Sequence, residues 1–224
     1  MIYDSNLGCL VLNRILLRLI SVTSVTALVA FGSAPLSALP TSSAVTADTA
    51  VFAGGCFWGI QGVFQHLKGV TSAVSGYAGG SRVSPSYEEV SSGATGHAES
   101  VQVIYDPAKI SYAQLLQVFF TVAHDPTELN YQGPDHGTQY RSVVFYHDAA
   151  QQHAAEAYVA ELGRTKMYSR PIVTQIVPLT KFYPAEGYHQ NYMARNPNSP
   201  YIMANDAPKV ARLQQEFPAL YQGR

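Results

Sequence analysis

The segment Gly54-Gly-Cys-Phe-Trp-Gly59 marks a point where a strand passes into a helix. Apolar residues 50–53 precede it and predict a short buried strand that ends at the glycine pair. From Cys56 onward, apolar side chains recur at spacings of three, four and three over residues 57–67, which is typical of one helix face. The glycines let the chain turn tightly and leave room for a ligand beside the cysteine.

The rest of the chain mixes strand and helix patterns. Strands are predicted at residues 70–77, 99–105, 142–146 and 172–179, and helices at residues 111–123 and at residues 149–162, closed by Gly163. Serines and Pro85 predict a loop, residues 125–139 a long polar loop, and residues 188–224 a coil-rich segment with helical turns. The interleaving lacks the regular alternation of a doubly wound sheet. It therefore predicts an α+β two-layer sandwich with a mixed, mainly antiparallel sheet.

Composition excludes two classes of function. The formal net charge is −1 and no dense run of basic residues is present, so a nucleic-acid partner is not expected. The seven histidines are scattered and only two cysteines occur, which argues against a zinc site. We therefore expect no metal and no bound cofactor. The length suits one well-filled domain, which we expect to be a monomer.

Residues 1–47 predict a cleaved leader. Arg14 and Arg18 precede the apolar residues 19–31, which match a signal-peptide core but fall short of the about 20 residues that span a membrane. Small residues follow, with cleavage expected after Ala38, Ala44 or Ala47. We expect an exported, periplasmic or otherwise extracytoplasmic protein with one catalytic domain at residues 48–224 and no stable membrane insertion. An uncleaved leader is one alternative; a start codon assigned too early is another and predicts a cytoplasmic protein.

Loss of the leader would remove Cys9 and leave Cys56 as the only cysteine. A secreted domain with one cysteine has no internal disulfide, so this thiol needs an explanation. At a strand-to-helix junction, free amide groups and the helix dipole favour an anion, which predicts a lowered pKa for the Cys56 thiol. Phe57 and Trp58 are expected to wall a small apolar pocket beside it. A structural cysteine buried between two core aromatics explains the pattern equally well.

Two further segments carry candidate groups. Glu99 opens a strand, where burial would raise its pKa and allow it to act as a general acid. Judged by its pattern alone, a solvated strand-end glutamate is the simpler interpretation. Asp135, His136 and Tyr140 close the long polar loop, where they either line a cleft or satisfy backbone groups of the turn.

These segments together resemble the peptide-methionine sulfoxide reductase A family. The matched motifs occur in order and at appropriate distances: Gly55-Cys-Phe-Trp-Gly59, Gly96-His-Ala-Glu99, Asp135-His-Gly-Thr-Gln-Tyr-Arg-Ser142 and Tyr188-His-Gln-Asn-Tyr192. The resemblance covers residues 49–193 and implies an α+β fold with a ferredoxin-like core. It also implies reduction of peptide-bound and free methionine S-sulfoxide, which repairs oxidised proteins.

The resemblance implies a role for each matched residue. Cys56 matches the nucleophile that attacks the sulfoxide sulfur and becomes a sulfenic acid. Phe57 and Trp58 match the residues that hold the methyl group of the substrate. Glu99 matches the acid that protonates the sulfoxide oxygen. His136 lies within a matched segment without an assigned role.

Tyr87 and Tyr140 match two phenols that hydrogen-bond the sulfoxide oxygen, and Asp135 matches a polar residue that orients water and substrate. The chain departs from many relatives because residues 201–224 contain no resolving cysteine and Ser91 stands where some relatives carry one. It therefore resembles the single-cysteine branch. We expect an external thiol, such as thioredoxin, glutaredoxin with glutathione, or another thiol, to recycle it.

Two other interpretations fit part of the pattern. A cysteine acyl-transfer enzyme would need His97 or His189 beside the Cys56 thiol. A non-catalytic module would bind oxidised or apolar peptide side chains through Phe57 and Trp58. The first predicts turnover of esters or amides without a reductant, and the second predicts binding that survives replacement of the cysteine.

Overall fold

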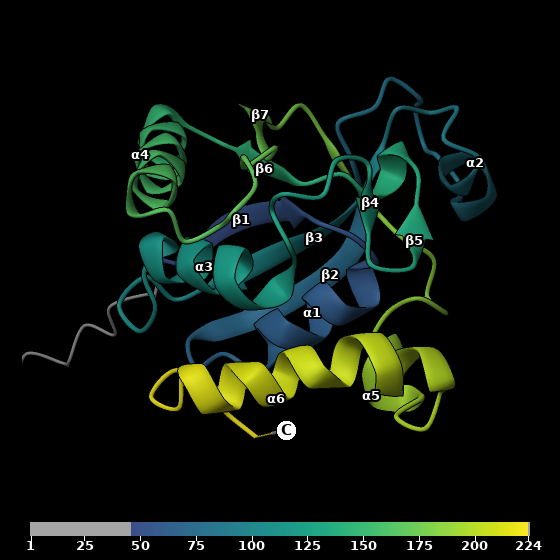
Figure 1. Cartoon of the computed structure of the whole chain (residues 1–224). Helices are drawn as coiled ribbons and strands as arrows, with labels where there is room; N and C mark the ends of the chain where they lie inside the picture. The colour runs from purple at the N-terminus through teal and green to yellow at the C-terminus, as the bar shows by residue number, and fades with distance from the viewer. Residues whose placement is uncertain (1–45, 224) are drawn as a thin grey trace, which may run out of the picture. The chain divides into compact units, whose positions relative to one another are not determined.

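The computed structural model describes residues 46–223 (Figure 1). The leader predicted at residues 1–47 falls almost wholly on residues that are not described, so its cleavage and the fate of Cys9 stay predictions. Within the described range, no helix combines the length and the apolar character needed to cross a membrane.

Strands and helices are interleaved along this range. The strands are β1 Asp48–Ala53, β2 Val70–Ala78, β3 Ala98–Tyr105, β4 Tyr131–Gln132, β5 Asp135–His136, β6 Val143–Tyr146, β7 Gln175–Pro178 and β8 Phe182–Pro184. The helices are α1 Phe57–Gln65, α2 Tyr87–Ser91, α3 Tyr112–Val118, α4 Ala149–Thr165, α5 Tyr192–Arg195 and α6 Ala207–Glu216. Two π-helical turns, Phe119–Ala123 and Ile202–Asp206, and a 3₁₀ turn, Thr138–Tyr140, complete the set.

One mixed sheet forms the centre of the domain. Its six strands lie in the order β7-β6-β1-β3-β2-β8, while β4 and β5 form a separate hairpin. All neighbours in the large sheet are antiparallel except β6 and β7, which are parallel. Along the chain, β1, α1, β2, β3, α3 and β6 follow the order β-α-β-β-α-β. The α+β class and the mixed, mainly antiparallel sheet are thereby confirmed.

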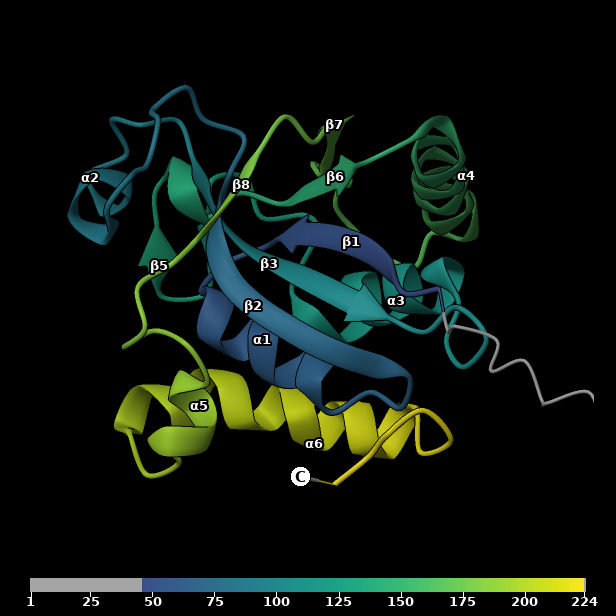
Figure 2. The same cartoon turned by 180° about the vertical axis from the view of Figure 1, so that it is seen from behind.

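Helices α1 and α3 cover one face of this sheet, and the view from behind shows strands β2, β3 and β1 in front of α1 (Figures 1 and 2). Helix α4 contacts α3, β6 and β7, and α6 packs on α1 from the outer side. The C-terminal helix therefore lies against the helix that follows Cys56. The start of α6 lies against the first turn of α1, whereas the end of the chain pairs with Leu67 just beyond the other end of α1.

Strand alternation explains how the two sides of β1 are used. Phe52 faces the helices, where its ring stacks on Phe64 at 5.2 Å and on Phe119 at 4.8 Å between centroids. Val51 and Ala53 belong to a smaller apolar cluster on the other face. The same period of two places Glu99 of β3 on the helix-covered face with Val101 and Val103.

The structure corrects four local expectations. The loop predicted around Pro85 contains α2, because Ser86 and Glu89 form a reciprocal capping box with hydrogen bonds of 3.3 and 2.9 Å. Helix α4 runs past Gly163 and ends before Lys166, which has φ 52. The long polar loop holds the β4-β5 hairpin, and the segment from residue 188 is more helical than predicted because α6 buries Leu213 in the core.

Candidate active site

Cys56 lies at the N-cap of α1, directly after the turn that leaves β1. The turn is tight: Gly55 has φ +95, and a Cβ there would meet Gln132 at 2.7 Å. A Cβ on Gly54 would meet the ring of His124 at 2.7 Å. The glycines are therefore required by close packing, and they hold a thiol that is only 8% exposed.

Burial decides the protonation state of this thiol. The pKa of Cys56 is raised well above its usual value, first by desolvation and then by the carboxyl groups of Glu99 and Asp206. The backbone amide of Trp58 acts in the opposite direction but is the weaker effect. The expectation of a lowered pKa is therefore wrong, because the helix terminus does not offset burial. The thiol is therefore neutral at neutral pH.

Glu99 lies beneath the first turn of α1. Its side chain is 2% exposed and accepts a hydrogen bond of 3.0 Å from the backbone N–H of Phe57. Desolvation raises the pKa of Glu99 to about 8, against the opposing effect of that hydrogen bond. The carboxyl group is therefore mostly protonated at pH 7, as a general acid requires. The alternative of a solvated strand-end glutamate is wrong.

Phe57 and Trp58 are held by the segment after β8. Phe57 is 1% exposed, and its ring centroid lies 5.0 Å from that of His189. Trp58 stacks on Tyr192 at 3.7 Å with an interplanar angle of 11°, and its indole N–H donates to His189 Nδ1 over 3.2 Å. The aromatic pair is thus fixed by residues more than a hundred positions away.

The two predicted phenols converge on the same carboxyl group. Tyr87 begins α2, and Tyr140 ends the 3₁₀ turn. Desolvation and then the negative charge of Glu99 raise the pKa of both phenols, that of Tyr87 to about 12. The charges of Cys56 and Asp135 add to both shifts. Both phenols therefore keep their protons across the physiological range and can donate to an oxygen placed among them.

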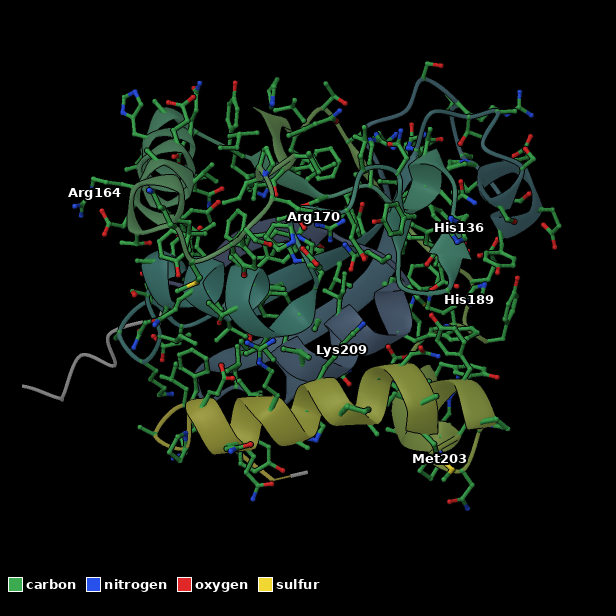
Figure 3. All side chains as sticks on the ribbon, in the orientation of Figure 1. His136, Arg164, Arg170, His189, Met203 and Lys209 are labelled. Carbon is green, nitrogen blue, oxygen red and sulfur yellow. The ribbon has the colours of Figure 1, made fainter. Side chains whose placement is uncertain are left out.

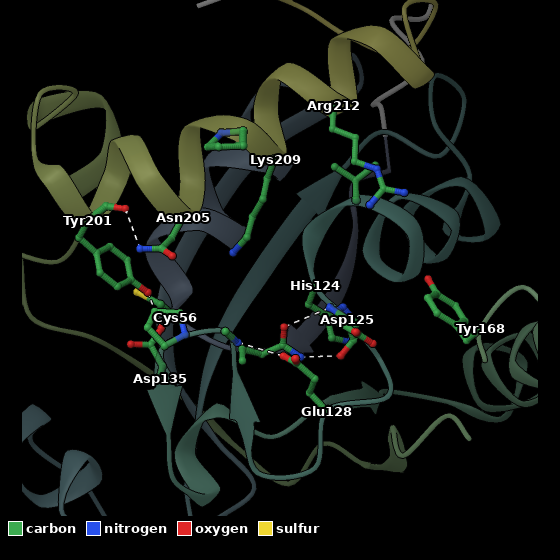
Figure 4. A pocket seen from close by; sticks show the side chains of 15 residues that line it. Cys56, His124, Asp125, Glu128, Asp135, Tyr168, Tyr201, Asn205, Lys209 and Arg212 are labelled. Carbon is green, nitrogen blue, oxygen red and sulfur yellow. Dashed lines mark hydrogen bonds between the residues drawn. The ribbon is translucent and has the colours of Figure 1, made fainter. Parts of the chain in front are cut away.

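A cavity of about 450 Å³ opens beside the thiol (Figure 4). Cys56, Asp135 and Tyr201 line one end of it. The Tyr201 hydroxyl donates a hydrogen bond to the Asp135 carboxylate, and the pKa of Tyr201 is raised by burial and by the neighbouring acids. Sequence reasoning missed Tyr201, because its only local signal was an aromatic residue in a segment expected to be coil.

Asp206 is a second residue that the sequence did not indicate. It is fully buried, its Oδ1 pairs with Lys209 at 3.2 Å, and its Oδ2 has no hydrogen-bond partner. A Cβ on Gly59 would stand 2.7 Å from its Cγ, so the carboxyl group packs directly on the first turn of α1. Figure 3 shows Lys209 projecting from α6 toward the body of the domain. Desolvation raises the pKa of Asp206.

No histidine supports the acyl-transfer interpretation. His97 is hydrogen-bonded to the backbone of Gly80 and Arg82, and His189 to the indole of Trp58. The leading causes of the shifted Cys56 pKa are burial, carboxyl groups and a backbone amide. Among residues 46–223, no group of three or more His, Cys, Asp or Glu side chains is arranged to hold a metal ion. The geometry instead places a neutral thiol beside a protonated carboxyl group and two phenols.

Comparison with known proteins shows which family the chain resembles. The family model described as peptide methionine sulfoxide reductase matches residues 48–220. The chain is 59% identical over 174 residues to "Peptide methionine sulfoxide reductase MsrA 2" of Mesorhizobium japonicum, covering 78% of this chain and 89% of that protein. It is 50% identical to the MsrA of Polynucleobacter asymbioticus, covering 78% of this chain and 92% of that one.

Solved structures give the same result. Mxr1 from Saccharomyces cerevisiae in reduced form is 36% identical with a TM-score of 0.62, over 68% of this chain and 87% of that chain. Methionine sulfoxide reductase A of Corynebacterium diphtheriae is 34% identical with a TM-score of 0.61, over 70% and 78%. The chain belongs to the peptide methionine sulfoxide reductase family, and it is an oxidoreductase that reduces methionine sulfoxide.

Proposed function

We propose that this reductase acts on the S epimer of methionine sulfoxide, in peptides and as the free amino acid, through attack of Cys56 on the sulfoxide sulfur. The observation that carries the proposal is the pairing of a buried thiol with a buried carboxyl group whose pKa is about 8. An acid of this strength holds its proton at neutral pH and gives it up to a stronger base. The sulfoxide oxygen becomes such a base as its bond to sulfur breaks.

The reaction balances with the groups present. Cys56 Sγ forms a bond to the sulfoxide sulfur while Glu99 delivers a proton to the oxygen, and Tyr87 and Tyr140 hydrogen-bond that oxygen. The thiol gives up its own proton in the same step, which returns Glu99 to its protonated form. The protonated oxygen then passes to Cys56 Sγ while its bond to the substrate sulfur and the new S–S bond both break, so the products are methionine and a Cys56 sulfenic acid.

Substrate orientation follows from the rigid aromatic pair. We assign Phe57 and Trp58 to the methyl group of the sulfoxide, and Asp135 to the orientation of water and substrate. Three different walls then receive the methyl group, the oxygen and the side-chain stem of the substrate. Such a pocket accepts one hand of a chiral sulfur, in accordance with the proposed S epimer.

Recycling then depends on an external thiol. Cys56 is the only cysteine among residues 46–223, so a sulfenic acid there has no partner in this part of the chain. A thiol such as thioredoxin, glutaredoxin with glutathione, or a small thiol would form a mixed disulfide and a second thiol would release it.

We also propose that residues 1–47 direct export and that the mature domain, residues 48–224, is a monomer.

The test is a single-turnover experiment on the full chain and on its Cys9→Ser variant. Without reductant, each should release about one methionine per chain and then stop. Mass spectrometry of the variant should show one added oxygen at Cys56, or an adduct with dimedone. A Cys9–Cys56 disulfide in the full chain, lost in the variant together with thiol-supported turnover, would contradict the single-cysteine mechanism. Absence of any methionine release would contradict the proposed reaction itself.

A further inference from the structure

The cavity beside Cys56 overlaps only in part with the group of residues assigned to the sulfoxide. Of those residues, only Cys56 and Asp135 line it. It continues from Tyr201 along α6 and reaches Tyr168 at its far end (Figure 4). Cys56 therefore borders a space that extends well beyond the residues assigned to the sulfoxide.

Opposite charges face this cavity from two elements. Lys209 and Arg212 are three positions apart on α6, which places them on the same helix face. The other wall carries Asp125 and Glu128, which follow the π-helical turn after α3. Figure 4 shows Lys209 and Arg212 extending from α6 on the side opposite Asp125 and Glu128.

Each of these charges is oriented by a partner that does not line the cavity. Lys209 pairs with Asp206 at 3.2 Å, and Arg212 pairs with Glu216 at 2.7 Å. On the other wall, Arg170 lies 3.1 Å from Asp125 and 3.9 Å from Glu128. The walls are thus held in place with a basic side and an acidic side. A molecule that carries both a carboxylate and an ammonium group is complementary to this arrangement.

The size of the cavity selects among thiols. Its volume of about 450 Å³ lies within the range of roughly 300–1,000 Å³ that is typical of small-molecule sites. Cys56 is 8% exposed, so a small thiol that enters the cavity reaches it with less displacement of the walls than a thiol held on the surface of a protein. A peptide of two or three residues with its own thiol is of a size that suits this volume.

We propose that this cavity is the docking site for the reductant, and that its ligand is a small zwitterionic peptide thiol. The inference rests on the proposed sulfenic acid at Cys56. The sulfur of the bound thiol attacks Cys56 Sγ, an S–S bond forms, and the S–O bond breaks. The oxygen of the sulfenic acid keeps its own proton, takes up the proton of the attacking thiol and leaves as water. A second thiol then attacks the mixed disulfide, which yields Cys56 thiol and an oxidised dimer of the reductant.

The test compares thiols of different charge in the Cys9→Ser full chain, where Cys56 is the only thiol. Turnover is measured at saturating sulfoxide and limiting thiol, with glutathione, the neutral 2-mercaptoethanol and the cationic cysteamine. Arg212→Glu reverses the charge of the basic wall. Arg164→Glu is the matched control, because Arg164 is also an exposed helical arginine paired with a glutamate, Glu161, and lies outside the cavity.

Arg212→Glu should lower the second-order rate constant of recycling by glutathione about tenfold, which corresponds to ~1.4 kcal/mol of transition-state binding. The rate with 2-mercaptoethanol should stay the same and that with cysteamine should not fall. Arg164→Glu should alter none of the three. In the enzyme that keeps Arg212, high salt should lower the rate constant for recycling by glutathione relative to that for 2-mercaptoethanol.

Two results would overturn the inference. An equal change for all three thiols would show that the charged walls do not bind the reductant. Arg212→Glu could instead alter the concentration of sulfoxide peptide needed for half-maximal methionine release and leave the selectivity among thiols intact. That result would assign the cavity to the residues that flank the substrate methionine. Failure of the proposed function is distinguishable from both, because it would abolish the first methionine released without any reductant.

Discussion

Replacement of Glu99 by Gln should slow the chemistry and stabilise the fold at the same time. The glutamine side chain has nearly the same volume as that of Glu99. Its carbonyl oxygen can accept the hydrogen bond that the Phe57 N–H donates to Glu99 over 3.0 Å. It has no proton to give to the sulfoxide oxygen. General acid catalysis contributes about 10²–10⁴-fold, so methionine release should slow by at least about a hundredfold.

The pH dependence follows from the raised pKa of Glu99. With a pKa of about 8, roughly nine in ten of these side chains are protonated at pH 7. Methionine release by the wild-type enzyme should therefore fall as the pH rises through about 8. The slow residual release of Glu99→Gln should lack this fall, because the amide does not titrate.

Although Glu99→Gln should slow methionine release, it should make the folded protein more stable. Raising the carboxyl pKa from 4.5 to about 8 costs the folded state on the order of 5 kcal/mol at alkaline pH, at about 1.36 kcal/mol per pH unit. Below pH 4.5 both folded and unfolded chains are protonated and the cost is absent. It grows as the pH rises and is complete above about 8. Glu99→Gln should therefore raise the free energy of unfolding at pH 9 and leave it almost unchanged at pH 4.5.

The assays are rapid-quench measurement of methionine release from pH 6 to 10 and urea unfolding at pH 4.5, 7 and 9. Glu156→Gln is the control, because Glu156 is an exposed glutamate of α4 outside the site. It should alter neither the release rate nor the pH dependence of stability. Wild-type release rates with wild-type pH dependence in Glu99→Gln would refute the assignment of the acid.

Three other results follow from the same geometry. Cys56→Ser should fold, as circular dichroism can verify, and release no methionine, whereas substantial turnover would remove Cys56 from the mechanism. With excess thiol, about half of a mixture of both sulfoxide epimers should be consumed, as chiral chromatography can measure. Complete consumption would contradict a pocket that accepts only one epimer. Gly59→Ala should lower the free energy of unfolding in urea by about 1–3 kcal/mol, because its methyl group displaces the buried Asp206 carboxyl. Gly163→Ala, with open space around its Cβ position, should instead be neutral or stabilising, and equal effects at the two glycines would contradict this packing.

Much of the site was predictable from local sequence. The strand before Gly54 and the helix after Cys56 follow from apolar spacing, and they place the thiol at the junction between them. The alternation of β3 puts Glu99 on the same face as Val101, so its burial could also have been inferred from the period of two. These features depend on neighbours in the chain, which a single sequence displays directly.

Other features depended on contacts between distant segments. The partner of Trp58 is His189, that of Asp135 is Tyr201, and no spacing in the sequence links either pair. The sign of the Cys56 pKa shift was mispredicted for the same reason. A helix terminus is visible in the sequence, whereas the depth of burial is not.

Sequence alone determined which reactive groups this protein has, and it placed Cys56 at the start of a helix and Glu99 in a strand. Tertiary structure decided their protonation, their orientation and the charged cavity that reaches the thiol. The physical reason is that reactivity here depends on desolvation and on charges a few ångströms away. Asp206 illustrates this: it lies far along the chain from Cys56, yet α6 packs it on the first turn of α1, where its charge acts on the thiol.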